Sequence, residues 1–385
     1  MKITIVSGFF LPVPPVAGGA AEKIWFRLAK EFAAAGHEVT YFSRSWPGFP
    51  DRETLDGIRM IRLRGYTHTR RLWLNLLLDF EWGLRVALRL PPGDFVVCNT
   101  VSLPVYLGLL RRKVGRTVAI LGRMPKGQGR FYGGVDRIIA TSEAVRDRIV
   151  LENPRLSART RVFRNPVDWA LHNAASGRMP APAPVTIGYL GRFHPEKGLD
   201  ILIQAAAELA RRPGLPPWRL RLIGPQEVSQ GGAGAQFVSG LREMAERAGV
   251  PVSIEPPVYD IPTLAGIYGS LDIFCYPSLA EKGEGLSVAP IEAMAAGAVP
   301  VVSSLDCYKD VIRDGGNGLV FDYRSKDRAT LLADRLASLI ADPAYRARLA
   351  ESAVEDSRRF DYTVVAKEIL ADFEGLKVER DLRAR

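Results

Sequence analysis

The sequence has few cysteines, few histidines and no long uninterrupted hydrophobic run. It has 385 residues, of which three are cysteine and four are histidine. Cys98, Cys275 and Cys307 are widely spaced and form neither a CxxC motif nor a Cys/His cluster, so the sequence predicts no disulfide framework and no metal site. No stretch reaches the roughly 20 apolar residues that a membrane span needs. The start of the chain, MKITIVSGFF, is typical of a buried strand and not of a signal peptide. We therefore expect a cytoplasmic protein.

Two nucleotide-related motifs are also missing. The loop SGFFLPVPPVAGG after the first strand lacks the GxGxxG spacing, which disfavours a dinucleotide-dependent oxidoreductase. The formal net charge of +10 favours anionic partners such as phosphates, nucleic acid or an acidic membrane surface. No basic tract is interleaved with aromatic residues, so nucleic acid is the least favoured of these.

The length and the element pattern predict two domains. Both halves alternate strands with helices, which indicates two doubly wound α/β domains with parallel sheets. Residues 1–168 form the first domain, 169–184 a Pro- and Ala-rich linker, and 185–360 the second domain, with a helix at about 361–385 that returns to the first. Strands are predicted at 2–6, 37–43, 95–99, 116–121 and 136–142, and at 185–191, 219–224, 252–256, 272–278, 298–304 and 318–322.

Two acids lie eight residues apart in KGEGLSVAPIEAMAAGAVPVV, residues 282–302. Pro290 fits the start of a short helix and Gly297 the residue after its end, so Glu292 lies in the first turn. There it either caps the helix or accepts hydrogen bonds from ligand hydroxyls. Glu284 stands between two glycines, on a loop whose backbone can approach a ligand closely. The backbone amides of Gly285, Leu286 and Ser287 could then face a phosphate or a sugar oxygen.

A second group of candidates follows the first strand of each domain. GRFHPEKG, residues 191–198, places Arg192 and Lys197 where a diphosphate would arrive in a doubly wound fold. Such a pair could neutralise a leaving diphosphate without a metal ion. The alternative is that both residues are ordinary exposed charges of the loop. Gly18 and Gly19 precede the first helix and could receive a phosphate or sugar at its N-terminus.

Taken together, these stretches resemble glycosyltransferase family 4, which comprises retaining, nucleotide-sugar-dependent enzymes of GT-B fold. The resemblance covers nearly the whole chain. It rests on Gly18-Gly19, on GHEV at 36–39, NPVD at 165–168, GRFHPEKGLDILIQA at 191–205, GEGLSVAPIEAMAAGAVPVV at 283–302 and NGLVFD at 317–322. The Glu-x7-Glu run together with the RxxxxKG loop makes it specific.

The resemblance implies a role for each matching position. Glu292 would hold the donor ribose hydroxyls. Glu284, helped by the amides of 285–287, would contact the transferred sugar. Arg192 and Lys197 would bind the diphosphate and stabilise it as it leaves. Gly19 would lie near the donor phosphates, and the base would lie against the segment around Val258. The acceptor hydroxyl would attack from the face that the diphosphate leaves, so no cofactor, metal or covalent glycosyl-enzyme is needed.

The sequence departs from the family in two places. Many members carry a histidine after a strand of the first domain, whereas here AILGRMPKGQGRFYGG, residues 119–134, contains none. Arg123 and Lys126 occupy that neighbourhood and either meet the acceptor or are ordinary loop charges. The Phe-Gly pair that the family has between its two acids is replaced by Gly285-Leu286.

The acceptor side is the least informative part of the sequence. Residues 66–92 combine Arg70, Arg71 and Trp73 with an apolar helical face. This pattern favours a core helix of the first domain, and the alternative is a helix that rests on a membrane and presents a lipid-linked acceptor.

We therefore expect a hexosyltransferase that is cytoplasmic or peripheral at the inner membrane face, acting on a small-molecule, glycan or lipid-linked hydroxyl. The alternatives are a nucleotide-sugar hydrolase or epimerase of the same fold and a non-catalytic nucleotide-sugar-binding protein. The base, the sugar, the acceptor, the linkage and the oligomeric state stay open.

Overall fold

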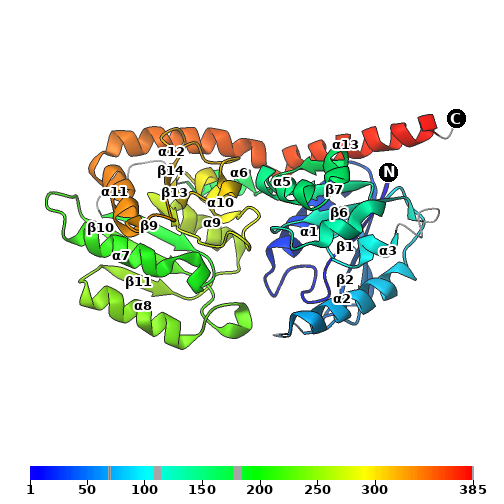
Figure 1. The fold of residues 1–385 in the computed structure, drawn as a ribbon, viewed down its shortest axis with the longest axis horizontal. Helices are drawn as coiled ribbons and strands as arrows, with labels where there is room; N and C mark the ends of the chain where they lie inside the picture. The colour runs from blue at the N-terminus through cyan, green and yellow to red at the C-terminus, as the bar shows by residue number, and fades with distance from the viewer. Residues whose placement is uncertain (68, 70, 108–113, 177–183, 384–385) are drawn as a thin grey trace. The chain divides into compact units, whose positions relative to one another are not determined.

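The chain consists of two compact α/β units (Figure 1). The computed structural model describes residues 1–67, 69, 71–107, 114–176 and 184–383. Unit 1 comprises Met1–Pro166 and Tyr362–Arg385, and unit 2 comprises Val167–Asp361. The predicted fold class, two doubly wound α/β domains, is confirmed.

The segment predicted as a linker is partly helical. Helix α6, Trp169–Ala174, begins inside it because the Asp168 carboxylate accepts a hydrogen bond from the Leu171 amide at 3.3 Å. It belongs to unit 2, where His172 lies 5.6 Å from the ring of Tyr268. Residues 177–183 of the predicted linker lie outside the described residues.

Unit 1 is built on an eight-stranded sheet of order β3-β4-β2-β1-β5-β6-β7-β8, in which only β3 is antiparallel to its neighbour. The direction of winding reverses between β1 and β5. The strands are β1 Lys2–Val6, β2 Glu38–Arg44, β3 Arg52–Leu55, β4 Ile58–Leu63, β5 Phe95–Cys98, β6 Arg116–Leu121, β7 Arg137–Ala140 and β8 Thr160–Val162.

Three strands of unit 1 were not predicted from the sequence. The hairpin of β3 and β4 turns at Asp56-Gly57, where both residues have positive φ, 52° and 77°. An Asp-Gly pair between short strands is a strong hairpin signal that could have located it. The third, β8, has only three residues, which is too short for its apolar and polar residues to show a strand periodicity.

The helices of unit 1 are α1 Ala20–Ala34, α2 Leu72–Ala87, α3 Leu103–Leu107, the 3-10 segments Gln128–Gly134 and Pro154–Arg159, α5 Glu143–Glu152 and α13 Tyr362–Arg383. The last helix is bound to the sheet by specific contacts. Phe373 stacks on Phe95 with ring centroids 4.4 Å apart, and Asp372 pairs with Arg137 at 2.8 Å. Unit 1 is thus completed by the end of the chain.

Unit 2 contains a six-stranded parallel sheet of order β11-β10-β9-β12-β13-β14. Winding reverses between β9 and β12, so the loops after these two strands flank the topological switch point at the carboxyl edge, where such sheets bind ligands. The strands are β9 Val185–Leu190, β10 Trp218–Ile223, β11 Val252–Glu255, β12 Ile273–Tyr276, β13 Val299–Ser303 and β14 Leu319–Phe321.

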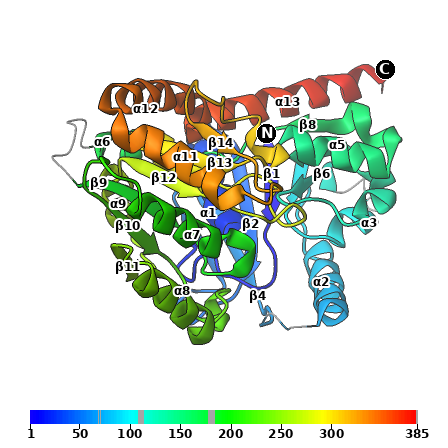
Figure 2. The same cartoon turned by 60° about the vertical axis from the view of Figure 1, so that its left-hand side comes forward.

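Helices cover this sheet on both faces and bury one continuous apolar core (Figures 1 and 2). The helix ends follow the sequence signals, as at Gly297, which has φ 88° and follows the end of α10. The helices after α6 are α7 Leu199–Ala210, α8 Ala235–Arg247, α9 Ile261–Gly269, α10 Ala289–Ala295, α11 Arg328–Ala341 and α12 Pro343–Ser357, with 3-10 segments at Pro195–Lys197, Val228–Gln230, Asp306–Tyr308 and Arg358–Phe360.

Helix α2 differs from its predicted role as a core helix. Its side chains of lowest exposure are Asn75, Asp79, Trp82, Gly83 and Val86, whereas most of its leucines and Phe80 are exposed. The prediction of a core helix is therefore wrong for the apolar face. Within the described residues, no helix combines the length and the hydropathy that crossing a bilayer requires.

Candidate functional site

The loop after β9 places two basic residues at the switch point of unit 2. Arg192 donates from Nη2 to Glu196 Oε1 at 2.6 Å and from Nη1 to the Gly231 carbonyl at 2.8 Å. Burial alone would raise the pKa of Glu196, but the charges of Arg192, Lys197 and His194 together lower it. Glu196 is therefore a carboxylate at neutral pH that holds the Arg192 guanidinium in the loop.

Lys197 is the more deeply buried of the two bases. It ends a 3-10 turn and is followed by Gly198, which has φ 68° and is the N-cap residue before α7. A Cβ at Gly198 would lie 2.2 Å from the Pro277 carbonyl oxygen, so glycine lets the β9 and β12 loops meet. This close approach brings Lys197 against the loop that carries Glu284.

Lys197 and Glu284 form a buried ion pair. The Lys197 Nζ lies 2.6 Å from Glu284 Oε2, and their side chains are 8% and 11% exposed. The Ser278 hydroxyl donates to the same carboxylate oxygen at 3.1 Å. Two residues that are 87 positions apart in the sequence are thereby joined at one edge of the sheet.

Aromatic side chains surround this ion pair. Lys197 Nζ lies 5.3 Å from the ring centroid of Tyr276. Burial, and then the charge of Glu284, raise the pKa of the Tyr276 and Tyr308 phenols far above the usual 10. Both phenols stay neutral, so the ion pair lies in a low-dielectric wall where its charges act strongly on any ligand that reaches them.

Glu292 is buried in the first turn of α10, as predicted, and is 4% exposed. Its carboxylate accepts a hydrogen bond from the Tyr268 hydroxyl, and burial followed by the charge of Glu292 raises the pKa of that phenol. Tyr268 was not singled out from the sequence, because it belongs to α9, a separate helix. It holds the Glu292 side chain in place.

The other predicted donor-site residues follow strands of the same sheet. Leu286 packs into the core of unit 2, Gly285 is buried beside it, and the Ser287 hydroxyl bonds the phenol of Tyr276. Val258 follows β11, two strands away from β9. All of these lie beyond the carboxyl ends of their strands, as the sequence predicted.

The candidates of unit 1 lie after β1 and β6. Gly18 and Gly19 have φ 83° and 98° and precede α1, and a Cβ at Gly19 would lie 2.3 Å from Glu22 Oε2. Arg123 and Lys126 are exposed in the loop after β6. Glu22 was missed from the sequence, where it looks like an ordinary first-turn acid.

Glu22 gives a pH-dependent prediction. Burial raises its pKa above the usual 4.5, although its own backbone amide and Arg123 act in the opposite direction. An acid with a raised folded-state pKa binds more protons in the folded chain, so stability falls as pH rises from 4.5 through the folded value. Urea unfolding should show Glu22→Gln gaining stability over the parent chain at pH 7.5 and losing that advantage at pH 4.

The matched control is Glu31→Gln, which removes a partly exposed carboxylate of the same helix, 3.7 Å from Arg27. Its stability difference should be small, as for other ion pairs that are not fully buried. If the stability advantage of Glu22→Gln were the same at both pH values, Glu22 would not be a buried carboxyl with a raised pKa.

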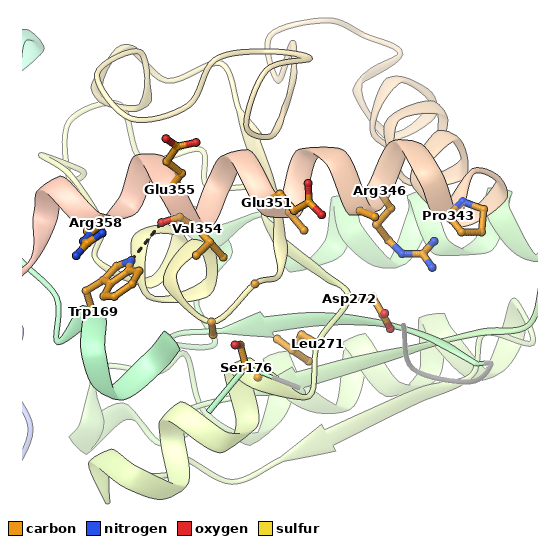
Figure 3. Close-up of a pocket in the computed structure, with 15 residues that line it drawn as sticks. Trp169, Ser176, Leu271, Asp272, Pro343, Arg346, Glu351, Val354, Glu355 and Arg358 are labelled. Carbon is orange, nitrogen blue, oxygen red and sulfur yellow. Dashed lines mark hydrogen bonds between the residues drawn. The ribbon is translucent and has the colours of Figure 1, made fainter. Parts of the chain in front are cut away.

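Unit 2 also has a pocket of about 540 Å³ that contains none of these residues (Figure 3). It lies between α12 and the residues that precede β12 and β13, at the amino edge of the sheet. Its lining includes Trp169, Leu271, Asp272, Arg346, Glu351 and Val354. Because doubly wound sheets bind their ligands at the carboxyl edge, we do not assign this pocket to the donor.

Two family models match the chain. Residues 17–170 match the model described as Glycosyltransferase Family 4, and residues 180–356 match Glycosyl transferases group 1. The boundary between them falls close to the boundary between units 1 and 2. Among the described residues, no group of three or more His, Cys, Asp and Glu side chains could hold a metal ion.

Curated relatives agree with the family models. A D-inositol 3-phosphate glycosyltransferase of a Nocardioides species is 30% identical over 396 residues, covering 91% of this chain and 84% of its own length. A phosphatidyl-myo-inositol mannosyltransferase of Mycobacterium tuberculosis is 30% identical over 201 residues, 50% of this chain. The match to the mycobacterial enzyme spans about half (49%) of that enzyme.

Solved structures show the same fold. Sucrose-phosphate synthase from Thermosynechococcus elongatus superposes with a TM-score of 0.77 at 21% identity, covering 98% of this chain and 100% of that one. The Anabaena protein Alr3699/HepE, in complex with UDP and glucose, gives a TM-score of 0.71 at 20% identity, covering 97% and 100%. With the family models and the relatives, these matches show that the chain belongs to glycosyltransferase family 4 and has the GT-B fold.

Proposed function

We propose that the chain transfers a sugar from a nucleotide-diphosphate sugar to an acceptor hydroxyl with retention of configuration and without a metal ion. The observation that carries the proposal is the buried Lys197–Glu284 pair at the switch point of unit 2. A diphosphate that arrives there competes with Glu284 for the Lys197 ammonium. Glu284 then becomes available to the sugar hydroxyls. The crystal complex of Alr3699/HepE with UDP and glucose supports a donor of this class.

Catalysis in this proposal depends mainly on stabilising the leaving diphosphate. Lys197 and Arg192 supply two positive charges for the departing diphosphate, and the buried surroundings of Lys197 strengthen its charge. A diphosphate oxygen takes the proton of the attacking hydroxyl on the face from which it leaves, so the configuration at the anomeric carbon is kept. Glu292, held by Tyr268, binds the donor ribose, and the base lies near Val258.

The unit 1 residues complete the proposal. Gly18 and Gly19 come close to the donor phosphates, and Arg123 and Lys126 meet the acceptor. The three free cysteines are buried, which supports a reducing, cytoplasmic location.

Hydrolysis or epimerisation of a nucleotide sugar is the competing activity on the same site, and product analysis without acceptor separates the two. Binding without turnover is the third alternative.

Thermal unfolding with a panel of nucleoside diphosphates and nucleotide sugars, all with EDTA, tests the donor. One nucleotide sugar should raise the midpoint, with about 2.7 kcal/mol of stabilisation at one hundred times its Kd. NMR of the product with that donor should show the anomeric configuration of the donor. An inverted product, or activity that EDTA abolishes, would contradict the mechanism.

Arg192→Ala should lower kcat/KM by about a hundredfold, because a charge on the leaving group is lost. The Arg192 side chain is 37% exposed, so its removal should leave the unfolding midpoint nearly unchanged. Arg211→Ala, at an exposed arginine after α7, is the matched control and should retain activity. Equal activity of the two variants would show that Arg192 does not stabilise the leaving diphosphate.

A further inference from the structure

Helix α2 leaves most of its large apolar side chains exposed. The side turned into unit 1 buries Trp82 and Val86 in the core and, beside them, Asn75 and Asp79, which are 8% and 6% exposed. The opposite side carries six large apolar side chains that are between 44% and 70% exposed. We call them the outer face of α2: Leu72, Trp73, Leu76, Leu77, Phe80 and Leu84. Their spacings of three and four residues place them along one side of the helix.

The polar groups on the inner side fix this orientation. Asp79 accepts hydrogen bonds from the amides of Val101 and Ser102 at 3.4 and 2.7 Å. Asn75 accepts from the Thr69 amide at 3.0 Å and donates to the Thr69 carbonyl at 2.8 Å. Rotating α2 to bury its leucines would break these bonds and leave a carboxylate without its donors. The apolar side is therefore held outward by satisfied polar contacts.

The outer face extends onto the neighbouring helix. Phe80 packs edge-on against Tyr106 of α3 at 5.6 Å, and the Tyr106 hydroxyl donates to the Phe80 carbonyl. Val101 and Val105, near this contact, are also exposed. In both ribbon views α2 lies at the periphery of unit 1 (Figures 1 and 2). A contiguous apolar surface of this kind marks an interaction site.

The charges around the outer face are basic. Arg71 precedes the helix, and Arg89 follows it; both are exposed. The two acids of α2 are not presented to a partner, because Asp79 is buried and Glu81 pairs with Arg85 at 2.6 Å and with the Tyr66 hydroxyl at 2.9 Å. An apolar stripe with a tryptophan and with cations at both ends matches an anionic lipid surface, where apolar groups enter the acyl boundary and arginines meet phosphates.

We propose that the outer face of α2 docks unit 1 onto the surface of an anionic lipid bilayer. The proposal does not depend on the donor chemistry, since binding is measured without substrate. It gives the chain a peripheral position from which acceptors at the bilayer surface come within reach.

The test is flotation of the full chain with vesicles of phosphatidylcholine alone and of equal parts phosphatidylcholine and phosphatidylglycerol. The parent chain should partition at least about tenfold more strongly onto the anionic vesicles at low salt. The variant Leu76→Ser/Leu77→Ser/Phe80→Ser should lose at least about tenfold of that binding. Because these side chains are exposed, its circular dichroism and unfolding midpoint should match those of the parent chain.

The matched control replaces three exposed apolar residues of unit 1 away from α2, Val16→Ser/Leu151→Ser/Val378→Ser, and should bind vesicles as the parent chain does. Arg71→Glu/Arg89→Glu should weaken binding to the anionic vesicles only. Equal binding by the triple variant and the parent chain would overturn the proposal. So would absence of vesicle binding together with a self-association, seen by sedimentation, that the triple variant abolishes.

Discussion

Lys197→Met is expected to lower kcat/KM by about two to three orders of magnitude and to destabilise the fold at the same time. The loss of activity follows from the missing charge on the leaving diphosphate. The loss of stability, about 3–5 kcal/mol, follows because the buried Glu284 side chain loses its cationic partner. Steady-state kinetics and urea unfolding measure the two effects separately.

The double variant Lys197→Met/Glu284→Gln separates chemistry from folding. Both buried charges are gone, and the Gln carbonyl can still accept from the Ser278 hydroxyl, so stability should return to within about 1–2 kcal/mol of the parent chain. Activity should stay as low as in Lys197→Met. If activity recovers together with stability, the lysine is structural and the proposed role in leaving-group stabilisation is wrong.

An exposed ion pair of the same unit provides the control. Arg212 Nη2 lies 2.6 Å from Asp334 Oδ1, with side chains that are partly exposed. Arg212→Met should change stability by less than about 1 kcal/mol and leave kcat/KM unchanged, because screened surface pairs contribute little. The contrast shows that burial and position, and not the loss of any lysine or arginine, produce the effects at residue 197.

The parts of the site that are local in the chain could be predicted from the sequence. Glu292 in a first turn and Gly297 after the helix end follow from capping signals within ten residues. The pairing of Lys197 with Glu284 could not be predicted, because it depends on two loops that only the strand order β9-β12 brings together. For the same reason the Tyr268–Glu292 bond was missed.

Helix α2 shows a different limit. Its apolar residues have helical spacing, and that spacing is the same whether the apolar side faces a core or faces outward. The distinguishing signal was Asn75 and Asp79, two polar residues on one side of the helix. In the sequence these two residues only interrupt an apolar run, whereas in the structure they help to anchor the helix to unit 1 through Thr69 and Ser102.

Gly198→Ala is expected to disable the proposed donor site through the backbone alone. Residue 198 has φ 68°, and the new Cβ would lie 2.2 Å from the Pro277 carbonyl oxygen, so the β9 and β12 loops must separate. Lys197 is the neighbouring residue, and a displacement of about 1 Å costs an enzyme on the order of a hundredfold. We expect that loss in kcat/KM, and a destabilisation larger than the roughly 1–2 kcal/mol of a left-handed alanine.

Gly214→Ala isolates the backbone conformation from the contact. Gly214 has φ 79° in the same unit, and a Cβ there would meet nothing within 4 Å. It should lose only the roughly 1–2 kcal/mol of the left-handed conformation and keep full activity. If Gly198→Ala were as active as Gly214→Ala, the approach of the two loops would not be what aligns Lys197 with Glu284. The ion pair would then have to be positioned by α7 and the Ser278 hydroxyl alone.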